Sequence, residues 1–469
     1  MKREMKKSKV KPNWSDAATT AENEVLPRWL KWAWTSRGMS LAINVILIAQ
    51  ITYYCTDMLG MSATLVGALL LASKVFDGVT DLLAGVLIDR THTRMGKARP
   101  YQICIVFVWL FTVFLFSTPA KFGMLAKSIY VIVMYTAVNS IFATLLNCGD
   151  AVHLSRSVRS EKNRVSVLSF NGSITMIVSI VITMILPQLI NSLGTTRRGW
   201  TTIALMMAVP FGIIGSLRFL FVKEVVTDDA SEQGEAGNKI PVRESIGCIF
   251  RNRYIWILSG MTFLVQMISG INSSVNTYYF KYIMGNIGLA SIVAMSSLVT
   301  PIVLVFFPVL TRKFGTVKLL RIGAILEIAG YAIRTIGGAN MLTLMVGTIL
   351  TTIAVLPVTM MISIYVADCM DYGEWKTGIR VEGMIGSVNS FMNKIGNGVA
   401  SGVVGIIMGM AGYDGSLAVQ SAAANASIVT LYNVVPLVFA VIMLILAIAY
   451  NLDKKLPEIR RTLAEKKGR

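Results

Sequence analysis

Charged residues and histidines are scarce in this chain of 469 residues. Lys, Arg, Asp and Glu together make up 15% of the sequence, and there are two histidines, His92 and His153. Hydrophobic residues reach 54%, and the mean hydropathy is +0.63. This composition lies outside the range of ordinary soluble domains and excludes a soluble globular protein. Two histidines without partners at ligand spacing also disfavour a membrane-embedded metalloenzyme.

Cysteine is scarce as well, and its five positions show no paired spacing: Cys55, Cys104, Cys148, Cys248 and Cys369. This pattern favours neither a disulfide framework nor a thiolate metal site. The first 30 residues are polar and lack the apolar core of a cleavable signal peptide. We therefore expect the first apolar helix to act as its own insertion signal.

Long apolar runs, in contrast, recur along the whole chain. A membrane-spanning helix needs about 20 mostly apolar residues, and twelve runs come near or exceed that length. They are 36–59, 63–88, 100–118, 126–150, 165–191, 199–222, 254–282, 286–311, 317–337, 341–366, 382–411 and 424–450. We therefore expect an all-α membrane protein with twelve transmembrane helices.

A single long charged connection, residues 223–253, divides these runs six from six. Two homologous bundles joined by a linker would have this organisation. We expect one six-helix bundle over 36–222 and a second over 254–450. Residues 1–35 and 451–469 are expected to be tails, and 223–253 a loop, all on the cytoplasmic side.

The net charge of +19 falls into alternate loops and does not form one binding face, so we expect no nucleic-acid partner. By the positive-inside rule the loops rich in Lys and Arg are cytoplasmic, which places both termini inside and predicts a multi-pass protein of the cell membrane. The rich loops contain Arg90, Arg94, Lys97 and Arg99, then Arg156, Arg159, Lys162 and Arg164, then Arg312, Lys313, Lys318 and Arg321.

Three charges interrupt the second apolar run: Lys74, Asp77 and Asp81. Spacings of three and four place them on one helical face, and a charge near the bilayer centre costs about 2.5 to 3.5 kcal/mol on insertion scales. Two carboxylates so close must share a cation, or one must take a proton. The pattern predicts a cation site, with the Thr80 hydroxyl as a further oxygen ligand. A purely structural salt bridge to Lys74 is the alternative.

Lys394 lies twelve residues into the eleventh run, about 18 Å deep at the rise of an α-helix. Asp77 reaches a comparable depth from the opposite side. A lone lysine at that depth is expected to meet an acid, and the Asp77–Asp81 pair is the candidate.

Other polar residues suggest further roles. Asn44 in the first run is suited to lining a cavity, whereas Glu327 and Arg334 in the ninth run suggest a local structural pair. Residues 367–383 form a dense charged segment, expected to be a cytoplasmic loop. Its mixed signs predict a salt-bridge network that could open and close as a gate, built from Asp368, Asp371, Glu374 and Arg380.

Three motifs in order resemble one family. They are Asp77-Gly78-Val79-Thr80-Asp81 through Arg99-Pro100-Tyr101, then Asp368 through Gly383, then Phe391-Met392-Asn393-Lys394-Ile395-Gly396 with Gly412-Tyr413. On these residues the chain resembles the glycoside–pentoside–hexuronide:cation symporters of the major facilitator superfamily, and the resemblance covers nearly all of it.

The resemblance implies that Asp77 and Asp81 bind the coupling ion, Na⁺ or H⁺, with Thr80 and Thr136. It implies that Lys394 joins this network together with Lys74. The substrate carboxylates of the sugar-binding members align with Ser40 and Asn139 here, and a substrate arginine aligns near Asn171. We keep Ser40, Asn44, Asn139, Asn171 and Lys394 as candidate substrate contacts.

The expected function is therefore secondary active symport of a sugar, glycoside or hexuronide with Na⁺ or H⁺, by alternating access and without a cofactor. We expect a monomer in the lipid bilayer, with no metal other than the transported cation. The alternatives are a carrier of another small solute and a cation-independent exchanger. An enzyme or a sensor is disfavoured, because neither requires paired acids at this depth.

Overall fold

The structure, a computed structural model, describes residues 26–91, 93–158, 160–224, 250–378 and 382–467. In this part of the chain the regular structure is helical, apart from an isolated bridge between Thr93 and Gly96. The helices follow one another as twelve long rods, several of them broken by a short π or 3-10 turn, and a short helix follows the last rod.

The first six rods form the N-terminal bundle. In order they are α1 (Arg28–Ile48) with α2 (Ile51–Tyr53) and η1 (Tyr54–Met58); α3 (Ala63–Asp89); η2 (Arg99–Ile103) with α4 (Cys104–Leu115); α5 (Met124–Thr136) with η3 (Ala137–Ala143) and α6 (Thr144–Ser157); α7 (Glu161–Leu193); and α8 (Arg197–Phe221).

The next six rods form the C-terminal bundle. They are α10 (Arg253–Tyr278) with η5 (Tyr279–Ile283); α11 (Leu289–Ala294) with η6 (Met295–Leu298) and α12 (Val299–Phe314); α13 (Thr316–Gly337); α14 (Met341–Ala354) with α15 (Leu356–Thr377); α16 (Glu382–Met410); and α17 (Ala422–Val429) with η7 (Thr430–Val434) and α18 (Val435–Ala449). The turn η8 (Leu452–Lys454) and helix α19 (Leu456–Lys467) follow.

Local sequence sets several helix boundaries. The Ser62 hydroxyl accepts a hydrogen bond from the backbone N–H of Leu65 and caps α3. Gly315 has a φ of 78° between α12 and α13, a conformation that favours glycine because it lacks a Cβ. Gly378 adopts the left-handed conformation just after α15 for the same reason.

Eight of the rods are long and apolar enough to cross a membrane by length and composition alone. The helix α13 is not among them, because charged residues, including Glu327 and Arg334, interrupt its apolar sequence. The hydropathy signal for a membrane-spanning helix is therefore weakest in a rod that has charged residues within its apolar sequence.

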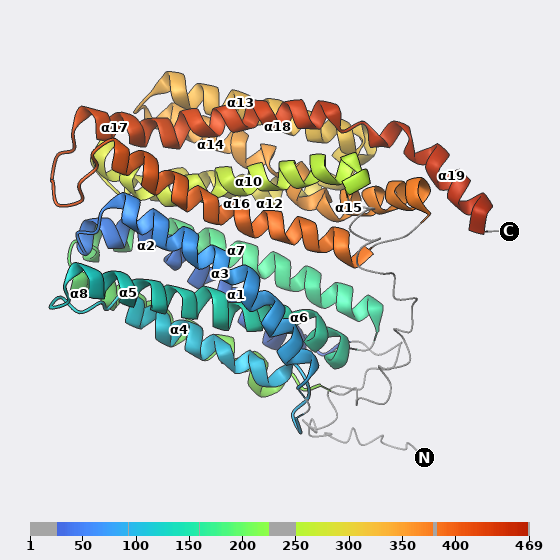
Figure 1. The fold of residues 1–469 in the computed structure, drawn as a ribbon, viewed down its shortest axis with the longest axis horizontal. Helices are drawn as coiled ribbons and strands as arrows, with labels where there is room; N and C mark the ends of the chain where they lie inside the picture. The colour runs from blue at the N-terminus through green and yellow to red at the C-terminus, as the bar shows by residue number, and fades with distance from the viewer. Residues whose placement is uncertain (1–25, 92, 159, 225–249, 379–381, 468–469) are drawn as a thin grey trace, which may run out of the picture.

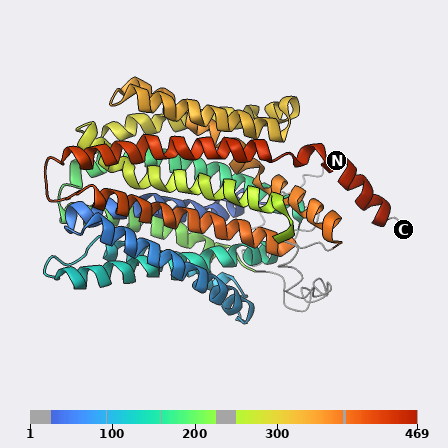
Figure 2. The same ribbon diagram turned by 45° about the horizontal axis from the view of Figure 1, so that its top comes forward.

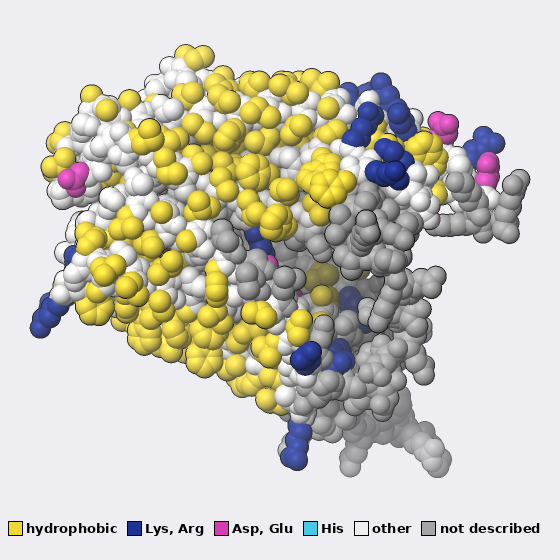
Figure 3. Space-filling model, viewed as in Figure 1, with side chains coloured by type: hydrophobic (Ala, Val, Ile, Leu, Met, Phe, Trp, Pro, Cys, Tyr) yellow, Lys and Arg dark blue, Asp and Glu magenta, His cyan; other side chains and the backbone are white. Residues whose placement is uncertain are grey.

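The two bundles lie side by side with their rods roughly parallel (Figures 1 and 2). We call the end of the molecule where α1 begins and α19 lies the terminal side, and the opposite end the far side. Hydrophobic side chains cover the flanks of both bundles in Figure 3, and Lys and Arg gather mainly toward the terminal side. An apolar flank of this kind suits contact with lipid chains.

Two helix pairs form most of the boundary between the bundles, α3 against α16 and α7 against α11. Glycines bring α3 and α16 close together: a Cβ placed on Gly405 would lie 2.7 Å from the Cα of Gly67. Small residues at such contacts let helix backbones approach closely in a membrane.

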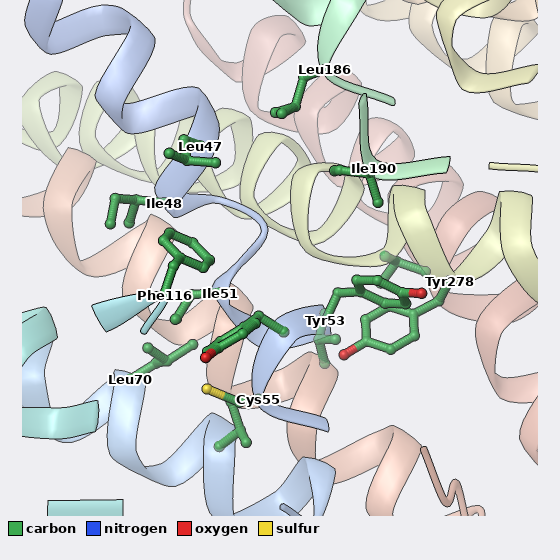
Figure 4. Packing of buried hydrophobic residues seen from close by; sticks show 14 of the residues in the cluster. Leu47, Ile48, Ile51, Tyr53, Cys55, Leu70, Phe116, Leu186, Ile190 and Tyr278 are labelled. Carbon is green, nitrogen blue, oxygen red and sulfur yellow. The ribbon is translucent and has the colours of Figure 1, made fainter. Parts of the chain in front are cut away.

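The largest buried apolar cluster extends across this boundary near the far side (Figure 4). Tyr53 of α2 and Tyr278 of α10 meet there edge to face, with ring centroids 5.4 Å apart. The bundles are therefore packed against each other at the far side.

Several boundaries differ from the sequence-based expectation. The first helix begins at Arg28, inside the expected tail 1–35, and the tail 451–469 contains helix α19. The segment expected to be a loop after residue 366 is helical as far as Thr377, as the end of α15. Hydropathy marks where a chain leaves the apolar layer, but charged residues in water continue a helix without breaking it. Of the expected loop 223–253, residues 225–249 lie outside the described residues.

Candidate functional site

Asp77 is held from two sides inside the N-terminal bundle. Its Oδ2 accepts a hydrogen bond from Lys74 Nζ at 2.9 Å, and its Oδ1 accepts one from the Ser140 hydroxyl of η3. The residue is buried, with 5% of its surface exposed. Lys74 supplies the positive charge that a buried carboxylate needs.

Asp81, one turn further along α3, connects the two bundles. Its Oδ2 forms a salt bridge with Lys394 Nζ of α16, and its Oδ1 accepts from the Thr144 hydroxyl of α6 at 3.2 Å. The depth of Lys394 in the sequence predicts this contact. The contribution of Lys394 to coupling stays a prediction.

The two threonines predicted as ligands lie nearby but do not touch the carboxylates. The Thr80 hydroxyl donates to the carbonyl of Asp77 within its own helix, at 3.0 Å. Thr136 is hydrogen-bonded to Ser73 at 3.0 Å, and Ser73 lies 3.5 Å from the Ser140 hydroxyl. Thr136 is therefore linked to Asp77 through two serines, and the ligand roles of both threonines stay predictions.

The carboxylates of Asp77 and Asp81 and the nearby hydroxyls are suited to binding a hard cation. In this structure, lysine ammonium groups are paired with both carboxylates. Carboxylate and hydroxyl oxygens are the ligands that small hard cations prefer, and here each carboxylate has one lysine. Within the described residues, no group of three or more His, Cys, Asp and Glu side chains is placed to hold a metal ion. A bound cation would therefore compete with Lys74 and Lys394 for two carboxylates.

The acid–lysine network lies beside a hollow between the bundles. The Lys394 side chain is 47% exposed and that of Asp81 is 27% exposed, although both belong to helices of the bundle interface. Figure 3 shows basic and acidic side chains inside this hollow between the bundles. The site is thus partly exposed at the surface of the described residues.

The far side is closed by a cluster around Asp57 of η1, whose side chain has no exposed surface. Its Oδ1 accepts from Lys281 Nζ at 2.5 Å and from the Tyr282 hydroxyl at 2.7 Å, and its Oδ2 accepts from the Tyr413 hydroxyl at 2.7 Å. One acid of the N-terminal bundle thus holds three donors of the C-terminal bundle. We call Asp57, Lys281, Tyr282 and Tyr413 the far-side lock.

Sequence reasoning missed this lock. Asp57 is separated from its partners by 224, 225 and 356 residues. The signal available in the sequence was a single acid at the outer end of the first run, which also suits an ordinary solvated residue.

The candidate substrate residues from sequence lie mostly inside the N-terminal bundle. Ser40 is buried, donates to the carbonyl of Phe211 at 2.6 Å and accepts from Trp109 Nε1 at 2.8 Å. Asn44 is buried and donates to the Thr112 hydroxyl at 2.8 Å. Both side chains bond to other helices of their own bundle, and their substrate role stays a prediction.

Asn139 and Asn171 are less deeply buried. Asn139 donates to the carbonyl of Tyr135, one turn before it, at 3.2 Å. Asn171 of α7 lies against α1, where a Cβ on Gly38 would come within 2.4 Å of its Oδ1. Their contact with a substrate also stays a prediction.

A separate cavity of about 380 Å³ lies at the junction of the bundles. The N-terminal bundle contributes α1 and α7 to its wall, and the C-terminal bundle contributes α10, α11, α13, α14 and η7. Its polar lining includes Gln50, Asn272, Asn276, Tyr331, Arg334 and Tyr432. No member of the acid–lysine network lines it.

The predicted gate residues contact the C-terminal helix. Arg460 of α19 forms salt bridges of 3.0 Å with both Asp368 and Asp371 of α15. Glu374 lies on the same helix, and Arg380 lies outside the described residues. Asp368 and Asp371 thus pair with the tail of their own half, and a gating role for this segment stays a prediction.

Comparison with known proteins gives a consistent result. A family described as MFS/sugar transport protein matches residues 39–454. An isoprimeverose transporter of Lactiplantibacillus pentosus is 31% identical over 462 residues, covering 96% of this chain and 94% of the relative. A putative sulfoquinovose importer of Escherichia coli (strain K12) is 25% identical, covering 89% of each chain. A glucuronide carrier protein homolog of the same strain is 24% identical, covering 87% of this chain and 88% of the relative.

Solved structures share the fold at low sequence identity. A variant of a nucleoside transporter superposes with a TM-score of 0.60 at 12% identity, covering 90% of this chain and 98% of that one. A proton-dependent oligopeptide transporter gives a TM-score of 0.61 at 11% identity, covering 93% and 100%. At this identity the likeness concerns the arrangement of helices and not the solute.

Proposed function

Because the chain belongs to the MFS/sugar transport family of membrane transporters, as its resemblance to the glycoside–pentoside–hexuronide:cation symporters implied, we propose cation-coupled sugar symport. The protein would carry a sugar, glycoside or hexuronide together with Na⁺ or H⁺ by alternating access. The relatives named for isoprimeverose, sulfoquinovose and glucuronide support a sugar-like solute.

The observation that carries the proposal is the salt bridge between Asp81 and Lys394. It joins the two bundles at the level of the buried acid Asp77. A cation that bound Asp77 and Asp81 would displace Lys394 from Asp81 and so alter a contact between the bundles. Occupancy of the cation site and the relative position of the bundles would thereby be linked.

Alternating access also requires a barrier on each side of the site. In the proposed cycle, the far-side lock around Asp57 is one barrier and must break before solute can enter from that side. The charge distribution of the loops supports a cytoplasmic terminal side in the cell membrane. In the proposed cycle this arrangement would be the inward-open state.

The test is uptake by the purified protein in liposomes. Labelled sugars, glycosides and uronides would be offered under an imposed Na⁺ gradient, an imposed H⁺ gradient and no gradient. We expect accumulation of at least one sugar-like solute above its external concentration under one of the two gradients. Uptake that never exceeds equilibration under either gradient would instead favour a cation-independent exchanger.

Substitution of the two acids separates coupling from solute binding. We expect Asp77→Asn and Asp81→Asn each to abolish gradient-driven accumulation, because each removes an anionic cation ligand. Solute counterflow, which needs no net cation movement, should persist. Full accumulation by both variants would rule out these acids as the cation site.

A further inference from the structure

Among the described residues that line the cavity between the bundles, Arg334 of α13 is charged, and none is acidic. Arg334 is 3% exposed. Asp77 and Asp81 have Lys74 and Lys394 as their partners, so they do not balance this charge. Glu327 lies two helical turns away on the same helix, but it forms no salt bridge with Arg334 in the described part of the chain. The local pair expected from sequence is therefore absent from this state.

The surroundings of Arg334 hold its side chain without neutralising it. Its Nη2 donates to the carbonyl of Tyr432 at 3.0 Å. Its guanidinium lies over the rings of Tyr432 and Tyr331, 4.2 and 4.9 Å from their centroids. Gly347 of α14 provides the room, since a Cβ there would come within 2.4 Å of Arg334 Cγ. Neutral groups therefore fix the arginine in position and leave its charge uncompensated.

Two buried polar atoms of the cavity wall have no hydrogen-bond partner among the described residues. They are Arg334 Nε, a donor, and Asn272 Oδ1, an acceptor. The Asn272 amide is oriented by its Nδ2, which donates to the carbonyl of Ile268 at 3.0 Å and to the Tyr331 hydroxyl at 2.6 Å. Buried groups of this kind normally have partners, and both side chains belong to the wall of the cavity.

From this geometry we propose that Arg334 is an anion-binding subsite for the carboxylate of an acidic sugar. A guanidinium can bind a carboxylate through two parallel hydrogen bonds, and Asn272 Oδ1 would accept from a solute hydroxyl. A cavity of about 380 Å³ lies within the usual range for small-molecule sites. The proposal rests on the proposed function, because it names a substrate class and its recognition residue.

The subsite is distinct from the cation site. None of Lys74, Asp77, Asp81 and Lys394 lines this cavity. The carboxylate of the solute would supply the negative charge that no described residue of the cavity wall provides. A neutral glycoside would leave the buried arginine unpaired, which is costly. The cavity should therefore favour an acidic sugar over its neutral counterpart.

Direct binding tests the subsite without relying on transport. A glucuronide would be titrated into the purified full-length protein in detergent, in parallel with the neutral glucoside that carries the same aglycone. We expect the glucuronide to bind the wild type at least about tenfold more tightly, as fits a charge-assisted bond. Arg334→Gln should remove that preference, and Arg334→Lys should restore part of it because lysine keeps the charge but not the bidentate geometry.

Two further variants test whether the loss of glucuronide preference could come from a disturbed fold and not from a lost contact with the solute. Asn272→Asp keeps Arg334 but adds a carboxylate to the same cavity wall, so it should also weaken glucuronide binding. Arg321→Gln makes the same substitution on the same helix, but Arg321 binds the carbonyl of Ala447 at 3.1 Å and does not line the cavity. We expect it to leave the preference unchanged.

The outcomes separate this inference from the proposed function. If the protein accumulates neutral glycosides in liposomes but binds no glucuronide more tightly than its glucoside, the subsite is refuted and sugar transport stands. If glucuronide binding depends on Arg334 but no sugar accumulates under any gradient, the subsite stands and coupled transport is refuted. Equal loss of glucuronide and glucoside binding in Arg334→Gln would mean that Arg334 only supports the fold.

Discussion

At the scale of single residues, the functional chemistry lies in a few charges and their partners. Asp77 and Asp81 are four residues apart, yet their environments differ. Asp77 is enclosed with a lysine of its own helix, whereas Asp81 meets a lysine of the other bundle and faces water. Displacement of the Asp81 partner by a cation is therefore the easier of the two and changes a contact between bundles.

Lys394 can be tested as a competitor of the cation. We expect Lys394→Gln to lower the cation concentration that half-saturates binding, by about two- to fivefold, because a partly exposed salt bridge no longer has to break. Cation-dependent changes in tryptophan fluorescence of the purified protein would measure this. An unchanged or weaker cation affinity would show that Lys394 helps to build the site.

Asp57 is expected to hold the far side closed. Asp57→Asn removes the charge that Lys281 pairs with, so the far side should open more often. Thr277, which is buried and hydrogen-bonded across the bundles to Gln50 at 2.5 Å, can report this. In a variant with Thr277→Cys, we expect Asp57→Asn to speed labelling by a membrane-impermeant thiol reagent by about tenfold or more.

The matched control for that experiment is Asp414→Asn. Asp414 lies in the same far-side loop as Tyr413, but its carboxylate bonds to the N–H and hydroxyl of Ser416 and not to the lock. Labelling of Thr277→Cys should be unchanged by this substitution. Equal acceleration by both variants would mean that general loosening of the loop, and not the lock, controls access.

At the scale of elements, the α3–α16 contact depends on the absence of side chains. A Cβ on Gly405 would lie 2.5 Å from the carbonyl of Ala63 and 2.7 Å from the Cα of Gly67. Both contacts are with backbone atoms, which cannot move aside without moving the helix. The two bundles can therefore pack in this way only while position 405 of α16 has no Cβ.

Substitution at this contact should prevent closure. We expect Gly405→Val to reduce uptake to a few per cent of the wild-type rate or less, since the state that is closed at the far side would be strongly disfavoured. Gly85→Ala, on α3 where a Cβ would meet nothing within 4 Å, is the control and should retain uptake. Normal transport by Gly405→Val would contradict the close packing of these helices.

The elements also show what sequence alone could predict. Hydropathy and the charged segment 223–253 predicted the membrane-spanning rods and their division into two bundles, and the depth of Lys394 predicted its contact with an acid. Contacts such as Asp57 with Lys281 and Asp368 with Arg460 were not predictable, because they depend on how rods far apart in sequence face each other. The helix ends were misjudged where charged residues in water continue a helix, as in α1 and α15.

At the scale of the whole molecule, the two bundles are held in a state that is closed at the far side. A disulfide across the far side should trap it. A Cβ built on Gly409 lies 3.0 Å from the Cβ of Thr64, close to the spacing of about 3.5 to 4.5 Å in disulfides. We expect oxidation of Thr64→Cys with Gly409→Cys to stop uptake, and a reductant to restore it.

Each single-cysteine variant is the control for the trapped pair. Oxidant should leave uptake by either one unaffected, and only the double variant should show the faster gel migration of a cross-linked chain. Cross-linking without loss of uptake would show that the far side need not open during transport. That result would contradict alternating access around this boundary.

The cavity around Arg334 and the acid–lysine network share no residue. Substitutions on α10, α13 and η7 could then alter which solute is accepted without disturbing the groups proposed to capture the driving ion. Such a separation would make the protein a favourable starting point for directed evolution toward new cargo. A library confined to the cavity wall would explore selectivity while the energy source of transport stays intact.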